Sequence, residues 1–382
     1  MSSRNLKMMR ELPFELVVEI LTRVPVKDLL RFRCVCKSWR SLFKEERFWR
    51  QHMTHAPTRI VSFGWEDTLH GRFSENEMKM ILEEVKINVG DDIAWLTDAT
   101  AVVGHAHGLL CLYFQGNVFG LWNPSLRELR TIHPPHLYTW YEMGFGYDPS
   151  SQDYKLVLVL KTQGEGSRSS QALVLSLKSG AYRMIDCLCL ENFDMVHSTT
   201  AGTRVGEIIY WQVWGDNLKV TEKLLSFDLV SETFNLCPRP RPSNRGIGFP
   251  RLIAGLRGGG GLSTVGVDDM SSSGGLIVWS AQHDAAGRIK SWSKICSLSL
   301  AFLEISTGCP RIDNIFLASA MTYAGLLLAL VTFGGEEKKL LSYNLEDKSL
   351  TLVETSVSLS ICGFLRTYVE TLFPVPIPDW NP

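Results

Sequence analysis

The 382-residue chain lacks the long apolar segments that would place it in a membrane or send it out of the cell. No window approaches the ~20 uninterrupted apolar residues that are needed to span a bilayer. The first apolar cluster is interrupted by Glu15 and Glu19, so it does not have the form of a signal peptide. We therefore expect an intracellular protein, of the cytoplasm or the nucleus, with no membrane partner.

An excess of charge of one sign is also missing, because 39 lysines and arginines face 40 aspartates and glutamates. A dedicated nucleic-acid-binding protein would carry a basic excess, so no nucleic-acid partner is expected. The first fifty residues are an exception, with 12 basic and 6 acidic side chains. This basic head indicates either an acidic partner or an ordinary solvated helical surface.

The nine cysteines form no disulfide framework, since their number is odd and their spacing irregular, which fits a reducing compartment. They also lack the spacing of a zinc site. Cys34-x-Cys36 and Cys187-x-Cys189 are far apart in the sequence, and neither pair has the usual gap of two residues. We expect no metal site and no cofactor.

Catalytic motifs are absent as well. The chain has no Gly-x-Ser-x-Gly nucleophile elbow. His105 and His107 would point to the same side of a strand, which permits two metal ligands, but the sequence suggests no third ligand nearby. We expect a protein without catalysis of its own, and an active site assembled from distant loops stays an alternative.

The N-terminal residues contain three short helical patterns. Residues 11–24 carry apolar side chains at spacings of three and four, with Pro13 in the first turn and Pro25 behind the last. Further patterns follow at 28–32 and 35–43. About 40 residues rarely bury enough surface to fold stably alone. Either a partner or the rest of this chain is therefore expected to cover part of this apolar surface.

The chain contains, in order, Leu12-Pro13, Glu15-Leu16, Ile20-Leu21, Val24-Pro25, Leu29-Leu30 and Val35-Cys36-Lys37 with Trp39. This order resembles the F-box motif almost position for position, with Val24 standing where Leu is more usual. The resemblance implies a small all-α module of three helices, residues 1–52 with its core at 11–50. It also implies binding to the Skp-family linker of an SCF (Skp–cullin–F-box) ubiquitin ligase and, through the linker, to a cullin. The residues that the resemblance assigns to this contact or its support are Leu12, Pro13, Leu16, Ile20, Leu21, Pro25, Leu29, Val35, Cys36 and Trp39.

From residue 58 to 382 the pattern changes to short apolar runs broken by turn residues, which predicts strands. One hairpin pattern recurs, in which an Asn, Asp or Ser turn separates two apolar runs. Its copies are residues 121–128, 175–182, 227–234 and 343–350. The first three copies lie about 52 residues apart, close to the ~50 of kelch-type propeller units. A weaker copy combines residues 277–280 with 292–294.

We expect five such units from about residue 100, with the runs near residues 60–63 and Ile87 supplying another unit or closing the ring. Residues 144–150 predict an outer hairpin of one unit. A closed propeller protects the edges of so many short strands. A β-sandwich with long irregular hairpins is the alternative.

Several motifs of this part are similar to the F-box-associated interaction domain that is common in plant F-box proteins. They are Gly108-Leu-Leu-Cys-Leu112, Trp122-Asn-Pro-Ser125, Phe145-Gly-Tyr-Asp148 with Asp153-Tyr-Lys-Leu156, Ser226-Phe-Asp-Leu229 with Glu232, and Ser291-Trp-Ser-Lys294. The resemblance implies a mainly-β, kelch-like propeller that binds a protein target without catalysis.

A group of aromatic residues on an expected loop, Tyr138, Trp140 and Tyr141, is our candidate for part of the target-binding surface. Clustered loop aromatics favour recognition because they bring a large contact area with few rotatable bonds. Three other tryptophans fall within apolar strand runs and are expected in the core: Trp122, Trp211 and Trp279.

Three functions are compatible with the sequence. The first is a ligase adaptor, in which the head binds the linker and the propeller binds a protein substrate for ubiquitination. In the second, the propeller senses a carbohydrate or small molecule. In the third, the chain is an enzyme whose head serves only regulation or turnover.

Overall fold

The computed structural model describes most of the chain between residues 12 and 375. Inside this span it leaves out residues 64–67, 75–78, 85–98, 115–116, 135–140, 162–169, 188, 190–192, 195–200, 216–222, 241–250, 256–260, 269–274, 286, 309–311, 313–314, 324, 334–337 and 356–363. In the described part, no helix has both the length and the apolar character that crossing a bilayer requires.

From residue 12 onward, where the description begins, the N-terminal head contains four short helices: α1 (Phe14–Leu21), α2 (Val26–Phe32), α3 (Lys37–Leu42) and α4 (Glu46–Met53). Pro13 and Pro25 are the N-caps of the first two, where the residue needs no N–H donor of its own for the helix. The three expected helices are formed, and a fourth, α4, follows them. The buried side chains of α4 are Phe48, Trp49 and His52. Their spacing places them on one face of the helix, which is the face that packs inward.

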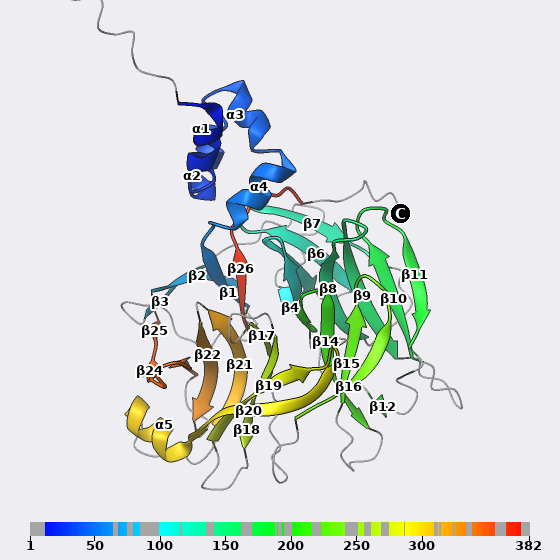
Figure 1. Cartoon of the computed structure of the whole chain (residues 1–382), viewed down its shortest axis with the longest axis vertical. Helices are drawn as coiled ribbons and strands as arrows, with labels where there is room; N and C mark the ends of the chain where they lie inside the picture. Colours follow the sequence, from blue (N-terminus) through cyan, green and yellow to red (C-terminus); the bar gives the residue numbers. More distant parts are fainter. Residues whose placement is uncertain are drawn as a thin grey trace, which may run out of the picture.

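The strands that the structure describes form six β-sheets, and five of these sheets use strands that follow one another in the sequence (Figure 1). The first contains β4 (Ala99–Ala106), β5 (Leu109–Phe114), β6 (Val118–Asn123) and β7 (Glu128–Ile132). The second contains β8 (Tyr141–Asp148), β9 (Asp153–Lys161), β10 (Ser170–Ser176) and β11 (Tyr182–Asp186). The third contains β12 (Phe193–Asp194), β13 (Thr203–Val205), β14 (Ile208–Gly215), β15 (Lys223–Asp228) and β16 (Phe234–Pro238).

The fourth sheet contains β17 (Arg251–Ala254), β18 (Leu262–Asp268), β19 (Gly275–His283) and β20 (Ile289–Ser299). The fifth contains β21 (Ile315–Tyr323), β22 (Leu326–Phe333), β23 (Lys339–Asn344) and β24 (Leu350–Leu352). Helix α5 (Leu300–Thr307) lies between these two sheets in the chain. The five units expected from about residue 100 are therefore confirmed.

The sixth sheet joins the two ends of the β region. It contains β1 (Thr58–Phe63), β2 (Thr68–Ser74), β3 (Lys79–Glu84), β25 (Glu354–Thr355) and β26 (Phe364–Val369). β26 pairs antiparallel with β1, so that Ile60 faces Thr367. The run near residues 60–63 thus closes the ring, whereas Ile87 lies outside the described residues.

Six inner strands surround the centre of the molecule. Contacts between neighbours run from β26 to β4, β8, β13, β17 and β21 and back to β26. Side chains also join neighbouring sheets of the ring: Thr322 Oγ1 donates to the carbonyl of Ala254 at 2.6 Å, and Trp211 Nε1 donates to that of Met143 at 2.8 Å. A closed ring of sheets is a β-propeller, and the sandwich alternative is excluded.

The position of the hairpin at residues 144–150 was predicted wrongly. Its first strand, β8, contacts β4 and β13 and therefore belongs to the inner ring, not to the outer edge. The sequence pattern of this segment does not distinguish an inner from an outer strand, because a strand of either kind has another sheet packed on each of its two faces. Met143 and Phe145 are buried in the apolar cluster between the first and second sheets.

The recurring turns have a common geometry that explains the sequence repeat. At each turn, a polar side chain accepts backbone N–H groups two or three residues ahead, as Asn123 Oδ1 does from Ser125 and Leu126 at 2.9 and 3.2 Å. The residue four positions after it takes a left-handed conformation. These pairs are Asn123 and Arg127, Asp148 and Gln152, Ser176 and Gly180, Asp228 and Glu232, and Asn344 and Lys348. All four predicted hairpins are formed.

Candidate partner-binding surface

An unusual amount of apolar surface is exposed on the head. The exposed fractions are 58% for Leu12, 52% for Phe14, 50% for Leu16, 53% for Ile20 and 63% for Val35. All but Val35 lie on or next to α1. Single exposed apolar residues are ordinary on a protein surface, but five within about 24 residues form a patch of the kind that marks an interaction site.

The ten residues predicted for linker binding divide into three groups. Seven are exposed: Leu12, Pro13, Leu16, Ile20, Pro25, Val35 and Cys36. Leu21 and Leu29 are buried, at 2% and 0%, and Trp39 is half-buried. The buried pair packs in the core of the head, whereas the seven exposed residues are open to direct contact.

Phe14 is an exposed aromatic residue that the sequence interpretation missed. It stands between two predicted positions, Pro13 and Leu16, and half of its surface is open to solvent. The helical spacing did not signal this exposure, because Phe14 shares the stripe of Val17 and Leu21, which is the inner face of α1.

The core of the head includes a residue from the far end of the chain. Leu372, which follows β26 and is 1% exposed, packs in one cluster with Leu29, Phe43, Phe48 and Trp49. The C-terminal part of the chain therefore supplies some of the surface that a module of this size needs to fold. Of the two alternatives, a partner or the rest of this chain, the rest of the chain therefore covers part of the apolar surface of the head. The exposed patch on and next to α1 is not covered by it.

Asn123 fixes the segment that carries Leu372. It is fully buried, and its Nδ2 donates to the carbonyls of Thr371 and Phe373 at 3.2 and 2.7 Å while its Oδ1 caps its own turn. An asparagine provides both the donors and the acceptor that this position needs. The Trp-Asn-Pro-Ser motif thus has a structural role, which is to anchor the chain beneath the head.

Aromatic and cationic groups complete the junction between head and propeller. Trp49 of α4 packs on Phe373, with ring centroids 4.4 Å apart, and lies 5.8 Å from the ring of His107. Arg50 stacks over Trp49 at 4.8 Å and donates to the hydroxyl of Tyr147 at 3.2 Å. The head is therefore packed against the first two sheets and not attached through a free linker.

A groove of about 850 Å³ lies beside this junction. Its lining comes from the end of α2, from α3, from the turn before β7 and from the segment after β26. It includes the exposed Val35 and Cys36 together with four cationic side chains, Arg33, Lys37, Arg40 and Lys44, and one acidic side chain, Glu128. Part of the basic excess of the head is thus concentrated here.

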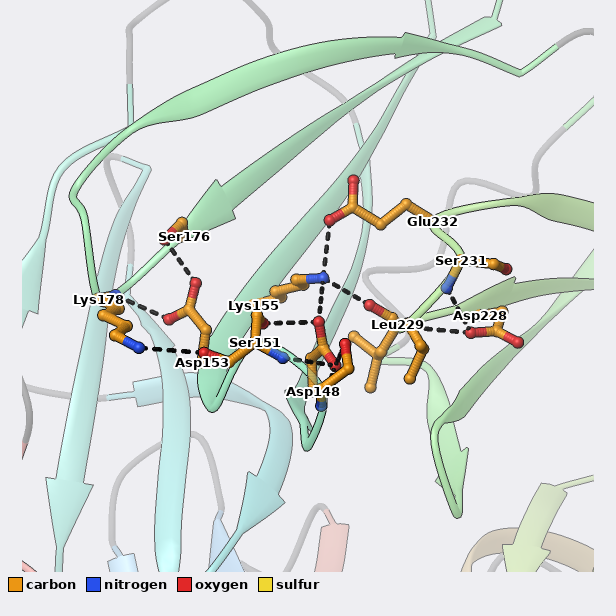
Figure 2. Close-up of polar contacts among 12 residues, drawn as sticks. Asp148, Ser151, Asp153, Lys155, Ser176, Lys178, Asp228, Leu229, Ser231 and Glu232 are labelled. Carbon is orange, nitrogen blue, oxygen red and sulfur yellow. Dashed lines mark hydrogen bonds and ion pairs between the residues drawn. The ribbon is translucent and has the colours of Figure 1, made fainter.

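A buried ion network connects the second and third sheets (Figure 2). Lys155 donates to Asp148 Oδ2 at 2.7 Å and to the carbonyl of Leu229 at 2.6 Å, and it pairs with Glu232 at 2.7 Å. Burial by itself would raise the pKa of Asp148, but hydrogen bonds from Lys155, Ser151 and Ser150 hold that pKa well below its usual range. Every group of this network is committed to another, so it joins two sheets and offers no free acid or base.

The histidine pair does not have the expected geometry. β4 ends at Ala106, and His107 lies in the following turn with a φ of 50°. Its Nδ1 lies 2.8 Å from the hydroxyl of Tyr154, and burial lowers the pKa of His107 to about 4. The expectation of two rings on one side of a strand was therefore wrong, because the strand stops one residue too early.

Among the described residues, no three or more His, Cys, Asp or Glu side chains lie close enough together to hold a metal ion.

Of the aromatic residues predicted for target binding, Tyr138 and Trp140 lie outside the described residues. Tyr141 begins β8, and its side chain is not described. Trp122 and Trp211 are 2% exposed, as predicted for core residues, whereas Trp279 is half-buried.

Sequence comparisons agree with this architecture. Residues 9–51 match the F-box domain and residues 69–375 match the F-box associated beta propeller domain. An F-box/kelch-repeat protein of Arabidopsis thaliana is 27% identical over 312 residues, covering 78% of this chain and 82% of its own length. Another F-box protein of Arabidopsis thaliana is 28% identical over 249 residues, covering 62% of this chain and 63% of its own length.

Solved structures with a similar arrangement are distant. An oligogalacturonate lyase from Vibrio parahaemolyticus aligns over 79% of this chain and 82% of its own, with a TM-score of 0.43 at 8% identity. A similarity of this level carries no conclusion about function.

Head, junction and ring together define a two-module protein in which a helical F-box is packed on a β-propeller. The chain belongs to the family of F-box proteins that carry an F-box associated beta propeller domain. Its relatives include plant proteins and one with kelch repeats.

Proposed function

We propose that this protein is the substrate-recognition subunit of an SCF ubiquitin ligase. In this proposal the head binds a Skp-family linker, which brings a cullin, and the propeller binds a protein target. The chain acts in the cytoplasm or the nucleus and contributes no catalytic residue. The observation that carries the proposal is the exposed apolar row of Leu12, Phe14, Leu16 and Ile20 on a head that is otherwise well packed.

The energetics of this row favour a bound partner. Full burial of one leucine- or isoleucine-sized side chain contributes about 1.5 to 3 kcal/mol of binding free energy. A side chain that is already half-buried contributes less, and the contributions of several such side chains add up. Four such residues on or next to α1 can anchor a partner in the way that central hot-spot residues do. The buried Leu21 and Leu29 behind them keep the row in place.

The packed junction supports an adaptor role. A ligase subunit accelerates ubiquitin transfer by raising the effective concentration of the target near the charged enzyme, which needs no acid, base or nucleophile from this chain. That effect is largest when the two binding surfaces are held at a fixed separation. Trp49, Phe373 and Leu372 provide such a connection between head and propeller.

The proposal is tested by co-purification from plant extract. The intact chain should retain a Skp-family linker and a cullin, identified by mass spectrometry, and Leu12→Ala/Pro13→Ala should lose both. Ile305→Ala, at an exposed position on α5 far from α1 in the sequence and with 84% exposure, is the matched control and should retain both. Absence of linker and cullin from a folded intact chain would refute the ligase role.

A further inference from the structure

Two cysteines whose spacing argues against a zinc site are brought together by the fold. Cys187 directly follows β11, and its Sγ lies 3.9 Å from the Sγ of Cys189. The two side chains therefore touch at the point where the chain leaves β11, the outer strand of the second sheet. A disulfide holds its two sulfurs about 2 Å apart, so the sulfurs of this pair need to approach by only about 2 Å more.

The two thiols differ in their access to solvent. Cys187 is 0% exposed and packs in the apolar cluster between the second and third sheets, together with Val159 of β9 and Trp211 of β14. Cys189 packs against the same cluster but is only half-buried, so solvent and small solutes reach this residue. One cysteine is therefore open to a reagent in solution, while its neighbour is enclosed by apolar side chains.

The contact between the sulfurs also separates the acidities of the two thiols. A hydrogen bond from Cys187 lowers the pKa of Cys189, and burial opposes that change only in part. The same hydrogen bond, together with burial, raises the pKa of Cys187. Because the thiolate is the reactive form of a cysteine, Cys189 is the nucleophile of the pair and Cys187 keeps its proton.

A thiolate beside a second thiol can be oxidised in two steps by a hydroperoxide such as hydrogen peroxide. In the first step the thiolate of Cys189 attacks one peroxide oxygen and the O–O bond breaks. This leaves a sulfenic acid on Cys189, and the other oxygen departs as water after protonation. In the second step the sulfur of Cys187 attacks that of Cys189, the S–S bond forms and the sulfenic oxygen leaves as a second water. Two thiols and one hydrogen peroxide thus give one disulfide and two waters, and the sulfurs supply the two electrons.

We propose that Cys187 and Cys189 form a reversible disulfide when the protein meets a hydroperoxide. This modification site lies on the segment that leads from the second sheet to the third, and it does not depend on the proposed ligase role. A dithiol reductant restores both thiols by thiol–disulfide exchange. Cysteines that served packing alone would stay reduced under the same conditions.

The head offers a matched comparison, because Cys34 and Cys36 have the same spacing. Both are exposed, and Cys36 Sγ lies 3.1 Å from Ser38 Oγ. A hydrogen bond from Ser38 lowers the pKa of Cys36, so a thiolate is also favoured in this pair. Reagents reach the head pair more easily than the propeller pair. Faster formation of a disulfide in the propeller pair would therefore report the contact between its sulfurs and not its accessibility.

The test follows both pairs in one sample of the full-length protein. The protein is treated with hydrogen peroxide at pH 7, the remaining thiols are blocked with iodoacetamide, and tryptic peptides are measured by mass spectrometry. Residues 184–204 form one tryptic peptide with Cys187, Cys189 and no other cysteine, and residues 34–37 form the peptide of the head pair. We expect peptide 184–204 to lose two hydrogens at least five times faster than peptide 34–37, and dithiothreitol to reverse the loss.

Single variants assign the two roles. Cys187→Ala removes the second thiol, so Cys189 should accumulate as a sulfenic acid that dimedone traps. Cys189→Ala removes the nucleophile, so Cys187 should stay a thiol. Circular dichroism with thermal melting shows that each variant is folded.

Three results would overturn the inference, and the first two need only the wild-type protein. They are the absence of a disulfide from peptide 184–204 of the folded protein, formation of the disulfide in peptide 34–37 at an equal or higher rate, and undiminished oxidation of Cys187 in folded Cys189→Ala.

Discussion

Trp49 and Phe373, from opposite ends of the chain, pack ring against ring with their centroids 4.4 Å apart. Through this contact the last helix of the head rests on the segment that leaves the last strand of the propeller. The head and the segment after β26 are thus held at the same junction, next to the sixth sheet, in which β1 pairs with β26 (Figure 1). Stability of the head and closure of the propeller are therefore expected to depend on each other.

Asn123→Ala tests this dependence. The change removes the donors to two carbonyls and the cap of a turn, and leaves buried acceptors unsatisfied. We expect the free energy of unfolding to fall by about 2 to 4 kcal/mol, with faster amide hydrogen exchange in the head as well as in the first sheet.

The matched control is Asn344→Ala, which removes the same turn cap from the fifth sheet, where the Oδ1 accepts from Glu346 at 2.9 Å. Its expected cost is below about 1 kcal/mol, without any effect on exchange in the head. Equal losses for the two variants would show that Asn123 is only another turn residue.

Lys155→Met tests the buried network between the second and third sheets. Removal of the ammonium group leaves Asp148 without its ion-pair partner and Glu232 with only Arg183. Breaking a buried pair in this way is expected to lower the free energy of unfolding by about 3 kcal/mol, measured by denaturant titration.

Lys178→Met is the control for that experiment, because the ammonium group of Lys178 is exposed and donates only to the carbonyl of Ser151 at 3.1 Å. It should cost less than about 0.5 kcal/mol. If Lys155→Met were equally mild, the network would not contribute to joining the sheets.

Acid should weaken the fold over a defined pH range. The pKa values of His105 and His107 fall to about 4 in the folded protein, mainly through burial, and the ordinary value is about 6.5. The unfolded chain then binds protons at a higher pH than the folded one. Stability is fully present above pH 6.5 and is lost as the pH falls toward 4, by about 1.4 kcal/mol per pH unit for each histidine.

His107→Gln should remove its share of that slope, measured as the free energy of unfolding at several pH values between 4 and 7. The control is His283→Gln at an exposed position, which should leave the slope unchanged. A slope that is identical in the wild type and in His107→Gln would contradict the assignment to this histidine.

Local signals made much of the fold predictable from the sequence. The turn at Asn123 and its copies repeat because each needs a polar acceptor and, four residues later, a residue that tolerates a left-handed conformation. Pro13 marked the start of the first helix and Pro25 its end for a similarly local reason, and Pro25 is also the N-cap of α2. Such features depend on neighbours in the chain, and these neighbours are visible in the sequence.

Contacts between distant residues were not predictable. Leu372 lies in the core of the head although more than 300 residues separate it from Leu29, and no spacing indicates this. For the same reason the motif assigned ten residues to linker binding but did not tell which of them are buried, as Leu21 and Leu29 are, and which are exposed, as Leu16 and Ile20 are. Which side of α1 faces inward is decided by α2, α4 and the C-terminal segment together.

The most direct test of the account is a titration of the full-length protein with a purified Skp-family linker, comparing the wild type with Leu16→Ala/Ile20→Ala. Both residues are half-exposed, so the account predicts a thermal midpoint within about 2 °C of the wild type and at least tenfold weaker linker binding. The control Ile305→Ala should bind like the wild type. Linker binding that is unchanged in folded Leu16→Ala/Ile20→Ala would contradict the claim that the exposed row on α1 holds the linker.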